Sequence, residues 1–321
     1  MTVSQETDLM KKISALICAI AMLVSLSACG SSGPSASSAS SSSSGDMVVA
    51  ATTYPVYLFT TAVVGDVGGV SVEQVITDKV SCIHDYTLTV PQMKILEKAD
   101  VVVENGAGFE NFMADALASS KAAVVDCSAG ISLLKMTEDG QEEDDPHIWM
   151  SPANAELMLK NIAAGLSAAD GANAAAYEAN CGEAIKQIES GIVPEGERIS
   201  SPQSCRLITF HDGFQYFVKY FGFELAASIE EESGSEASAK DIDNIVSLIN
   251  GAASTSAPIP AVFTEVNGSD ATAQAIARET GVGVYKLDLI MSGDGTGIQP
   301  YIDAVNSNYS TVRDAFAPKA N

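Results

Sequence analysis

The first part of the chain alternates short runs of β-branched residues with amphipathic stretches. The β-rich runs predict strands over residues 47–52, 70–76, 100–103 and 122–125. The stretches between them predict helices, because apolar residues recur there at helical spacing. One helix is opened by Pro55, and two more cover residues 91–98 and 110–117. Such alternation is typical of a parallel sheet with helices on both faces.

The β pattern stops in the middle of the chain and then returns. Residues 154–166 and 173–192 predict two helices with little β character. Further strands are predicted over residues 206–210, 223–227, 261–264 and 283–287. Helices lie between these strands, and Gly281 is a suitable stop for the helix that ends near Glu279. We therefore predict an α/β protein of two lobes, each a mainly parallel sheet flanked by helices. Ligands of such sheets bind beyond the carboxyl ends of the strands.

The predicted boundaries follow from these elements. The N-terminal lobe covers residues 46–170, a linking helix covers residues 171–200, and the C-terminal lobe covers residues 201–321. Each lobe is long enough to bury a hydrophobic core.

The N-terminus has the pattern of a secretory signal. Lys11 and Lys12 precede an apolar run over residues 13–26, which is too short to span a bilayer comfortably. The run ends in LSAC at residues 26–29, which resembles the lipobox of bacterial lipoproteins. We expect residues 1–28 to be a signal peptide and Cys29 to be lipidated, the alternative being simple cleavage near Ala28.

Residues 29–45 are almost entirely Ser, Ala and Gly after the cysteine, which predicts a flexible tether. No later segment is apolar and long enough to cross a membrane. The expected location is therefore extracytoplasmic, with a lipid anchor holding the protein at the cell membrane.

The net charge of −24 serves mainly to exclude one class of partner. A surface this acidic repels phosphate backbones, so we expect no nucleic-acid partner. Four cysteines remain after the signal and Cys29. Disulfide bonds between Cys82 and Cys127 and between Cys181 and Cys205 would each join residues that are close in sequence. Buried free thiols are an equally good interpretation.

The candidate chemistry lies in three histidines and two carboxylates. His211, Glu265 and Asp288 each follow a predicted strand, whereas His84 and His147 lie in loops. The histidines are too far apart in sequence for a local metal finger, so they suit a site assembled from two lobes. Imidazoles with a carboxylate are suitable zinc ligands. Scattered surface or helix-capping histidines are the alternative from the residues alone.

Several motifs around these residues make the chain similar to a known family. They are SCIHDY at residues 81–86, ADVVVENG at 99–106, DPHIWM at 145–150, ITFHDGF at 208–214, IEEESGSEAS at 229–238 and FTE at 263–265. In this order they resemble the zinc/manganese class of solute-binding lipoproteins of ABC transporters. The resemblance spans essentially the whole chain after the tether.

The resemblance implies two lobes joined by a long rigid helix, with a metal ion bound between them. It implies that His84, His147, His211 and Asp288 are the ligands. Glu265 is a candidate for orienting a histidine, or else an exposed carboxylate. The implied partners are an ABC permease and its ATPase, and we expect a monomer.

The third ligand position bears on the metal. Family members that carry manganese tend to have a carboxylate there, so His211 favours Zn²⁺ over Mn²⁺, as imidazole chemistry does. Some zinc members carry a histidine-rich loop before the second ligand, but residues 138–145 read EDGQEEDD, which we interpret as a solvated charge run. We expect Trp149 to be a core anchor behind His147, and the aromatic residues after His211 to be core.

Two alternatives belong to other classes of protein. A zinc hydrolase could use Glu265 as a general base, but the chain has neither a His-Glu-x-x-His helix nor a Gly-x-Ser-x-Gly elbow. The second alternative is a surface adhesin that merely resembles the carriers. We expect a carrier that is not an enzyme.

Overall fold

The computed structural model describes residues 46–79, 83, 86–138, 141–194, 197–230, 237–255 and 257–317. The expected signal peptide at 1–28, the lipidation site Cys29 and the tether at 29–45 lie outside these residues, as do Cys82 and His84. None of the helices that the structure describes is long and apolar enough to cross a membrane.

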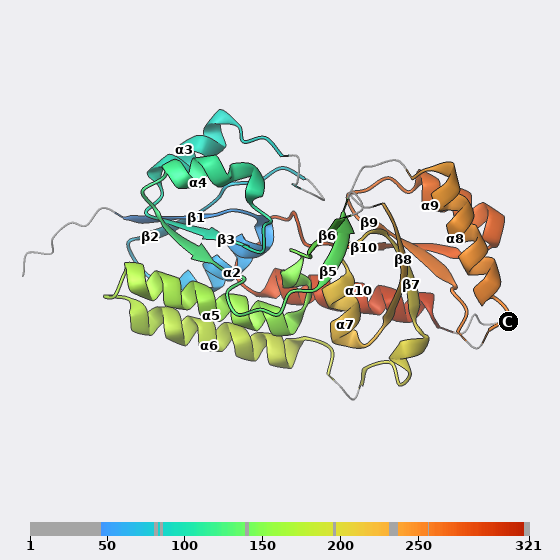
Figure 1. Ribbon diagram of the computed structural model, residues 1–321. Coiled ribbons are helices and arrows are strands. Elements are labelled where there is room, and N and C mark those ends of the chain that lie inside the picture. The colour runs from blue at the N-terminus through green and yellow to red at the C-terminus, as the bar shows by residue number, and fades with distance from the viewer. Residues whose placement is uncertain are drawn as a thin grey trace, which may run out of the picture. The chain divides into compact units, whose positions relative to one another are not determined.

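The N-terminal lobe is a four-stranded parallel sheet with helices on both faces (Figure 1). The strands lie in the order β2-β1-β3-β4 and comprise β1 (Met47–Ala51), β2 (Val70–Gln74), β3 (Val101–Glu104) and β4 (Ala123–Asp126). On one face lie α2 (Tyr54–Val64), α5 (Pro152–Ala169) and α6 (Ala174–Gly191), and on the other lie α3 (Val90–Lys98) and α4 (Ala114–Ser119). Coverage on both faces explains why the three consecutive valines of β3 are all fully buried.

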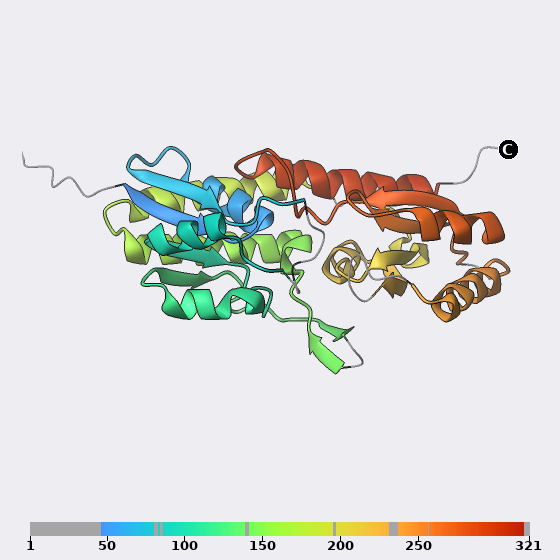
Figure 2. The same cartoon turned by 90° about the horizontal axis from the view of Figure 1, so that it is seen from above.

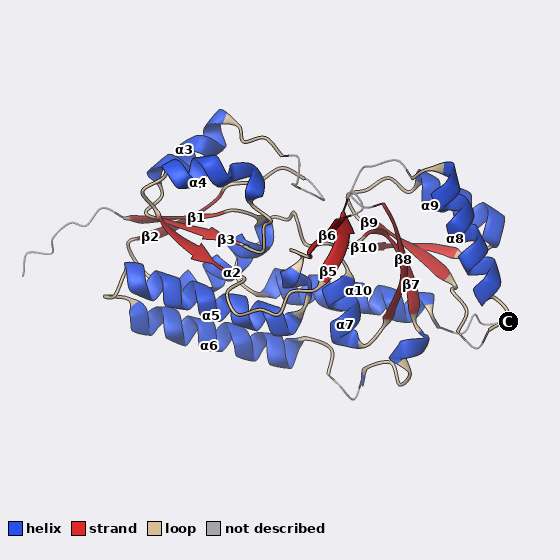
Figure 3. Cartoon of the chain, in the orientation of Figure 1, coloured by secondary structure: helices blue, strands red, loops and turns tan. Residues whose placement is uncertain are grey.

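The C-terminal lobe repeats this layered plan, as the colouring by element type makes clear (Figure 3). Its parallel strands have the order β10-β9-β7-β8. They are β7 (Arg206–His211), β8 (Glu224–Glu230), β9 (Ala261–Glu265) and β10 (Gly283–Leu287). Around them lie α7 (Gln215–Phe221), α8 (Ala239–Ala252), α9 (Ala271–Thr280) and α10 (Gln299–Ala315). The predicted class, α/β with two parallel sheets flanked by helices, is confirmed.

Local sequence signals account for several helix ends. Proline occupies the first turn of α2, α3, α5 and α10, where its missing N–H costs no hydrogen bond. Thr89 and Gln92 form a capping box at the start of α3. The expected stop of α9 at Gly281 is confirmed, because Gly281 follows the helix with a φ of 77°.

The helix expected to link the lobes corresponds to α6, which packs on α5 and α2 of the N-terminal lobe. Helix α10 follows the second sheet and contacts both α2 and α6. The ring of Tyr301 on α10 meets the ring of Phe59 edge-on at 5.0 Å between centroids. The lobe boundaries at residues 170 and 200 stay a prediction.

One element was not predicted. Residues of the acidic run and those just before it form a two-stranded antiparallel hairpin of β5 (Lys135–Glu138) and β6 (Gln141–Asp144), which projects from the rest of the chain in Figure 2. The residues of β6 are all exposed, as expected for a solvated charge run. Asp145, the last residue of that run, is fully buried, so the prediction is wrong there. An ion pair of 2.7 Å between Lys135 and Asp144 joins the strands at the hairpin base, a cross-strand contact that charge composition does not reveal.

The structure bears on whether the cysteines form disulfide bonds or are buried free thiols. Cys127, Cys181 and Cys205 are buried free thiols, so a bond between Cys181 and Cys205 is not formed. Burial raises the pKa of the Cys205 thiol to about 11, which keeps it protonated. These residues therefore pack as small hydrophobic side chains.

Candidate metal site

His147 is positioned by the base of the hairpin. Strand β6 ends at Asp144, and the short 3₁₀ helix Ile148–Met150 begins directly after His147. The backbone N–H of Asp145 donates to the carbonyl of Leu134 at 2.9 Å. The hydroxyl of Tyr216 accepts from the N–H of Leu134 and donates to the carbonyl of Asp145, both at 2.9 Å. The turn that carries His147 is therefore fixed from both strands and from α7.

The side chain of Asp145 orients the imidazole. Its Oδ1 atom lies 2.8 Å from Nδ1 of His147 and also accepts the backbone N–H of His147 at 2.9 Å. Both side chains are buried. A carboxylate at this distance holds the proton on Nδ1, so the Nε2 lone pair of His147 is directed away from Asp145.

His211 brings a second imidazole to the same point. It is the last residue of β7, at the carboxyl end of the second sheet, and is 1% exposed. Its Nε2 atom lies 3.1 Å from Nε2 of His147, with the two rings at 82°. Two nitrogens bound to one tetrahedral zinc ion at the usual Zn–N distance lie about 3.3 Å apart. The pair is therefore spaced to share one cation, or one proton.

Carboxylates make the surroundings of this pair negative. Asp212 Oδ1 lies 3.6 Å from Nδ1 of His211, and one ligand atom from each of His147, His211 and Asp212 falls within 4.8 Å of the others. Glu265, the last residue of β9, is 6% exposed. Burial lowers the pKa of His147, but Asp145, Asp212 and Glu265 outweigh it and leave the pKa raised above its ordinary value. A field that favours a protonated imidazole also favours a bound cation.

Among the described residues, Asp288 is not part of the close group of His147, His211 and Asp212. It follows β10 and is half-buried. Its backbone is held by Asn308, which accepts its N–H at 2.8 Å and donates to its carbonyl at 2.7 Å, and its Oδ1 accepts the N–H of Ile290 at 2.7 Å. Burial raises the pKa of Asp288, and the bond from Ile290 partly offsets this. His84, the remaining predicted ligand, lies outside the described residues.

Aromatic packing closes the wall behind His147. Trp149 is fully buried, its ring lies 5.4 Å from the imidazole, and its Nε1 donates to the carbonyl of Leu289 at 2.8 Å. The expectation that Trp149 is a core anchor behind His147 is confirmed. Tyr216 and Phe217 are buried as expected. Gly213 leaves no room for a side chain, because a Cβ atom there would lie 2.7 Å from Cδ2 of His147.

Three contributors were not singled out from the sequence. Asp145 and Asp212 are adjacent or near-adjacent to predicted histidines, so a carboxylate within two residues of each imidazole was a usable signal. Tyr216 gave no such signal, because its hydroxyl reaches Asp145 across 71 residues of sequence. Asp145 and Asp212 therefore act on histidines close to them in sequence, whereas the contact of Tyr216 with Asp145 is made only in the folded chain.

Comparisons with known proteins show which family the chain resembles. The family described as zinc-uptake complex component A periplasmic matches residues 49–315. The iron-binding protein YfeA of Yersinia pestis is 30% identical over 258 residues, covering 78% of this chain and 80% of its own length. The high-affinity zinc uptake system protein ZnuA of Bacillus subtilis is 26% identical over 334 residues, covering 97% of this chain and 99% of its own.

Solved structures show the same fold. A manganese-bound S38A mutant of a periplasmic metal-binding protein from Candidatus Liberibacter asiaticus superposes with a TM-score of 0.73 at 24% identity, covering 84% of this chain and 100% of that one. The solute-binding protein FpvC of P. aeruginosa, in complex with Ni²⁺, gives a TM-score of 0.73 at 25% identity, covering 86% and 99%. With a family match over nearly all of the described residues, the chain belongs to the periplasmic component A family of zinc-uptake complexes.

Proposed function

We propose that this protein captures Zn²⁺ between its two lobes and delivers it to an ABC importer. The observation that carries the proposal is the pair of buried Nε2 atoms of His147 and His211, 3.1 Å apart, one from each side of the lobe boundary. Asp145 supports the proposal because it leaves the Nε2 lone pair of His147 available for a metal ion.

The proposed ligands are His84, His147, His211 and Asp288. Asp212 is proposed to orient His211, and Glu265 to contribute negative charge rather than a ligand atom. Three imidazoles and one carboxylate form a donor set that suits tetrahedral zinc better than manganese, which prefers oxygen ligands. The zinc uptake function named for the Bacillus subtilis relative supports this choice, whereas the iron-binding relative shows that the family name alone does not fix the metal.

The protein would bind and release the ion without catalysing a reaction. Neutral imidazoles and an ionised carboxylate bind the metal, so binding releases protons from whichever histidines were charged. A carrier needs a permease and an ATPase to move the ion across the membrane, and the names of the matched family and relatives support such partners. Lipidation at Cys29 would keep the loaded protein near them.

The test of metal identity uses the purified full-length protein, elemental mass spectrometry and titration against a zinc chelator, with manganese as competitor. We expect one zinc per chain, held more tightly than manganese. His147→Ala and His211→Ala should each weaken zinc binding by more than about a hundredfold, beyond what loss of an orienting residue costs. Glu143→Ala, on the exposed hairpin, is the control and should match the unmodified protein.

Each other outcome contradicts a stated part of the proposal. Preference for manganese would keep a metal carrier and overturn zinc as its cargo. Unchanged zinc affinity in both histidine variants would overturn the site. Absence of any bound metal would favour the adhesin alternative, and catalytic turnover by the zinc-loaded protein would favour a hydrolase.

The anchor is tested separately. Cys29→Ser should abolish incorporation of labelled fatty acid and release the protein from the membrane fraction of expressing cells. Retention of label, or of membrane attachment, in Cys29→Ser would contradict lipidation at Cys29. Absence of label from the unmodified protein would favour simple cleavage near Ala28.

A further inference from the structure

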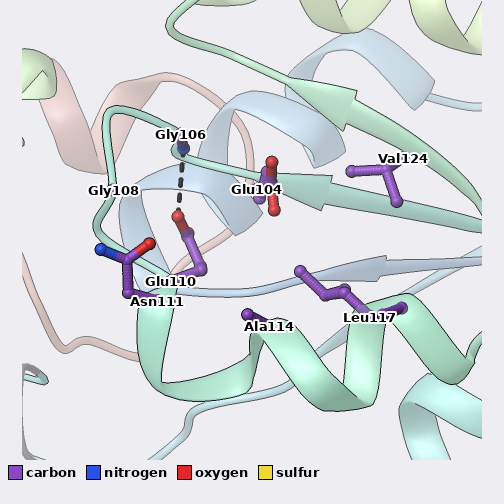
Figure 4. A pocket seen from close by; sticks show the side chains of 9 residues that line it. Glu104, Gly106, Gly108, Glu110, Asn111, Ala114, Leu117 and Val124 are labelled. Carbon is purple, nitrogen blue, oxygen red and sulfur yellow. Dashed lines mark hydrogen bonds between the residues drawn. The ribbon is translucent and has the colours of Figure 1, made fainter.

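Glu110 is a buried carboxylate in the N-terminal lobe that the proposed ligand set does not use. It is 4% exposed and ends the loop 105–110 that follows β3. Its Oε1 atom accepts the hydroxyl of Thr52 and the backbone N–H of Asn105, both at 2.7 Å, and its Oε2 accepts the N–H of Gly106 at 3.1 Å. Figure 4 shows the carboxyl group directed at Gly106. Three donors on one carboxylate tie the loop to the end of β1.

The loop that Glu110 holds reaches His147 at two points. Asn105 Nδ2 donates to the carbonyl of Pro146 at 2.9 Å, directly before the histidine. The ring of Phe109 lies 5.9 Å from the imidazole of His147 and 5.1 Å from the ring of Trp149. A shift of the loop would therefore move both the backbone before His147 and a ring that packs against it.

The loop needs outside contacts to keep its conformation. Gly106 has a φ of 79°, and Ala107 has a φ of 54°, in the left-handed region that side chains disfavour. A Cβ atom at Gly106 would lie 1.9 Å from Oδ1 of Asp126. The N–H of Ala107 donates to the hydroxyl of Ser128 at 3.1 Å. The N–H groups of Asn105 and Gly106 donate to the carboxylate of Glu110.

We propose that Glu110 is a positioning residue of the metal site, which acts in its carboxylate form through the loop 105–110 on His147. This inference rests on the proposed function, because it takes His147 as a ligand. Glu110 itself touches no proposed ligand; its contacts are with Thr52, Asn105 and Gly106.

The protonation state of Glu110 can change near neutral pH. Burial raises the pKa of Glu110 to about 7, against the lowering effect of its hydrogen bonds with Thr52 and Asn105, and the charge of Glu104 raises it further. The thiol of Cys127, whose pKa burial also raises, is a further titratable neighbour, and the carboxylate of Asp126 lies against Gly106. A cavity of about 400 Å³, lined by Glu104 and Glu110 among others, gives solvent protons access (Figure 4). Protonation puts a donor where the carboxylate accepted hydrogen bonds.

The test compares Glu110→Gln with the unmodified full-length protein at pH 8 and pH 6. At pH 8 the amide presents a donor to the N–H of Gly106, and we expect zinc affinity to fall about tenfold, as for loss of an orienting group. At pH 6 the side chain of Glu110 in the unmodified protein is itself neutral. The ratio of zinc affinities between the unmodified protein and Glu110→Gln should therefore shrink to less than about twofold. Protonation of the histidines is common to both proteins and cancels in the ratio.

Glu104→Gln is the matched control, because it removes the same charge from the same cavity without touching the loop N–H groups. Its affinity should stay within about twofold of the unmodified protein at both pH values. Trp149, the single tryptophan, reports on the loop through Phe109. Its emission in the metal-free protein at pH 8 should change in Glu110→Gln and not in Glu104→Gln.

The inference is overturned if Glu110→Gln binds zinc as tightly as Glu104→Gln does at pH 8. It is also overturned if the loss is the same at both pH values, since a packing defect would not depend on ionisation. Should Glu110→Gln fail to fold, Thr52→Val removes one donor and keeps the carboxylate, and a loss of about threefold at pH 8 is expected; no loss overturns the inference. His147→Ala measured in parallel separates the two proposals, because only failure of that variant to lose zinc contradicts the site itself.

Discussion

The Oδ1 atom of Asp145 lies 2.8 Å from Nδ1 of His147 and, at 2.9 Å, accepts the backbone N–H of the same residue. One carboxylate oxygen thus fixes both the ring and the main chain of a proposed ligand. Because the two side chains are buried, no water competes for these contacts. The pairing makes the affinity of the site depend on a residue that does not bind the metal.

We predict that Asp145→Asn weakens zinc binding about tenfold, because the neutral amide makes Nε2 of His147 less basic and holds the ring less firmly. Competitive titration against a chelator measures the change. Glu143→Gln alters a nearby exposed carboxylate of β6 and should leave the affinity within about twofold. Equal effects of the two substitutions would show that Asp145 does not orient the ligand.

Asp288 and Asp212 should differ in what they contribute. If Asp288 is a ligand, Asp288→Asn costs more than about a hundredfold in zinc affinity, while Asp212→Asn, which alters only the partner 3.6 Å from Nδ1 of His211, costs about tenfold. The two variants are compared in one titration series. The reverse order would put Asp212 into the ligand set in place of Asp288.

Zinc affinity should fall as pH drops from 8 to 6, because protons compete with the metal for the imidazoles. The pKa of His147 is raised above its ordinary value, so the competition should begin at a higher pH than for a free imidazole. Chelator titrations at intervals of half a pH unit give the slope. An affinity that is flat over this range would contradict histidine ligation.

The metal-free protein should show the opposite trend in stability. A protonated His147 stabilises the fold below the unfolded pKa, and this contribution is lost as pH rises through the raised folded pKa. Glu110 acts in the same direction, because with a folded pKa of about 7 against 4.5 the folded state takes up its proton first as pH falls. Between pH 8 and pH 6 Glu110 alone should add about 1 kcal/mol, or about 2–3 °C in Tm.

Scanning calorimetry of the chelator-treated protein at both pH values measures this gain. Glu110→Gln cannot titrate and should lose that part of the pH dependence, while Glu104→Gln should keep it. A Tm that falls between pH 8 and pH 6 in the unmodified protein would contradict both pKa directions.

Tyr216→Phe should destabilise the protein by about 1–3 kcal/mol, because it leaves the N–H of Leu134 and the carbonyl of Asp145 without the hydroxyl that joins them. Denaturant unfolding measures the loss. Tyr220→Phe is the control: its hydroxyl contacts Arg198 at 3.2 Å, away from the site, and its removal should cost less than about 0.5 kcal/mol. Equal losses would show that the hydroxyl of Tyr216 does not support the hairpin base.

Local sequence patterns were enough to predict the two α/β sheets and most of the strands, because period-2 and period-3.6 patterns and proline positions act within a few residues. Strand β10 was predicted with its observed ends, and β7 and β9 extend one residue further, to His211 and Glu265. The family motifs also pointed to His147 and His211 before any contact between them was known.

The contacts among these residues could not be predicted from local patterns, because they join segments far apart in the chain. The hairpin over residues 135–144 forms because its strands pair with each other and its base is fixed by Tyr216, a contact far away in sequence. The 3.1 Å between the Nε2 atoms of His147 and His211 likewise depends on segments that meet only after folding. The same is true of the contact between the loop 105–110, which Glu110 stabilises, and the residue before His147. Local patterns encode which elements form; distances between side chains from different elements are set by packing of the whole core.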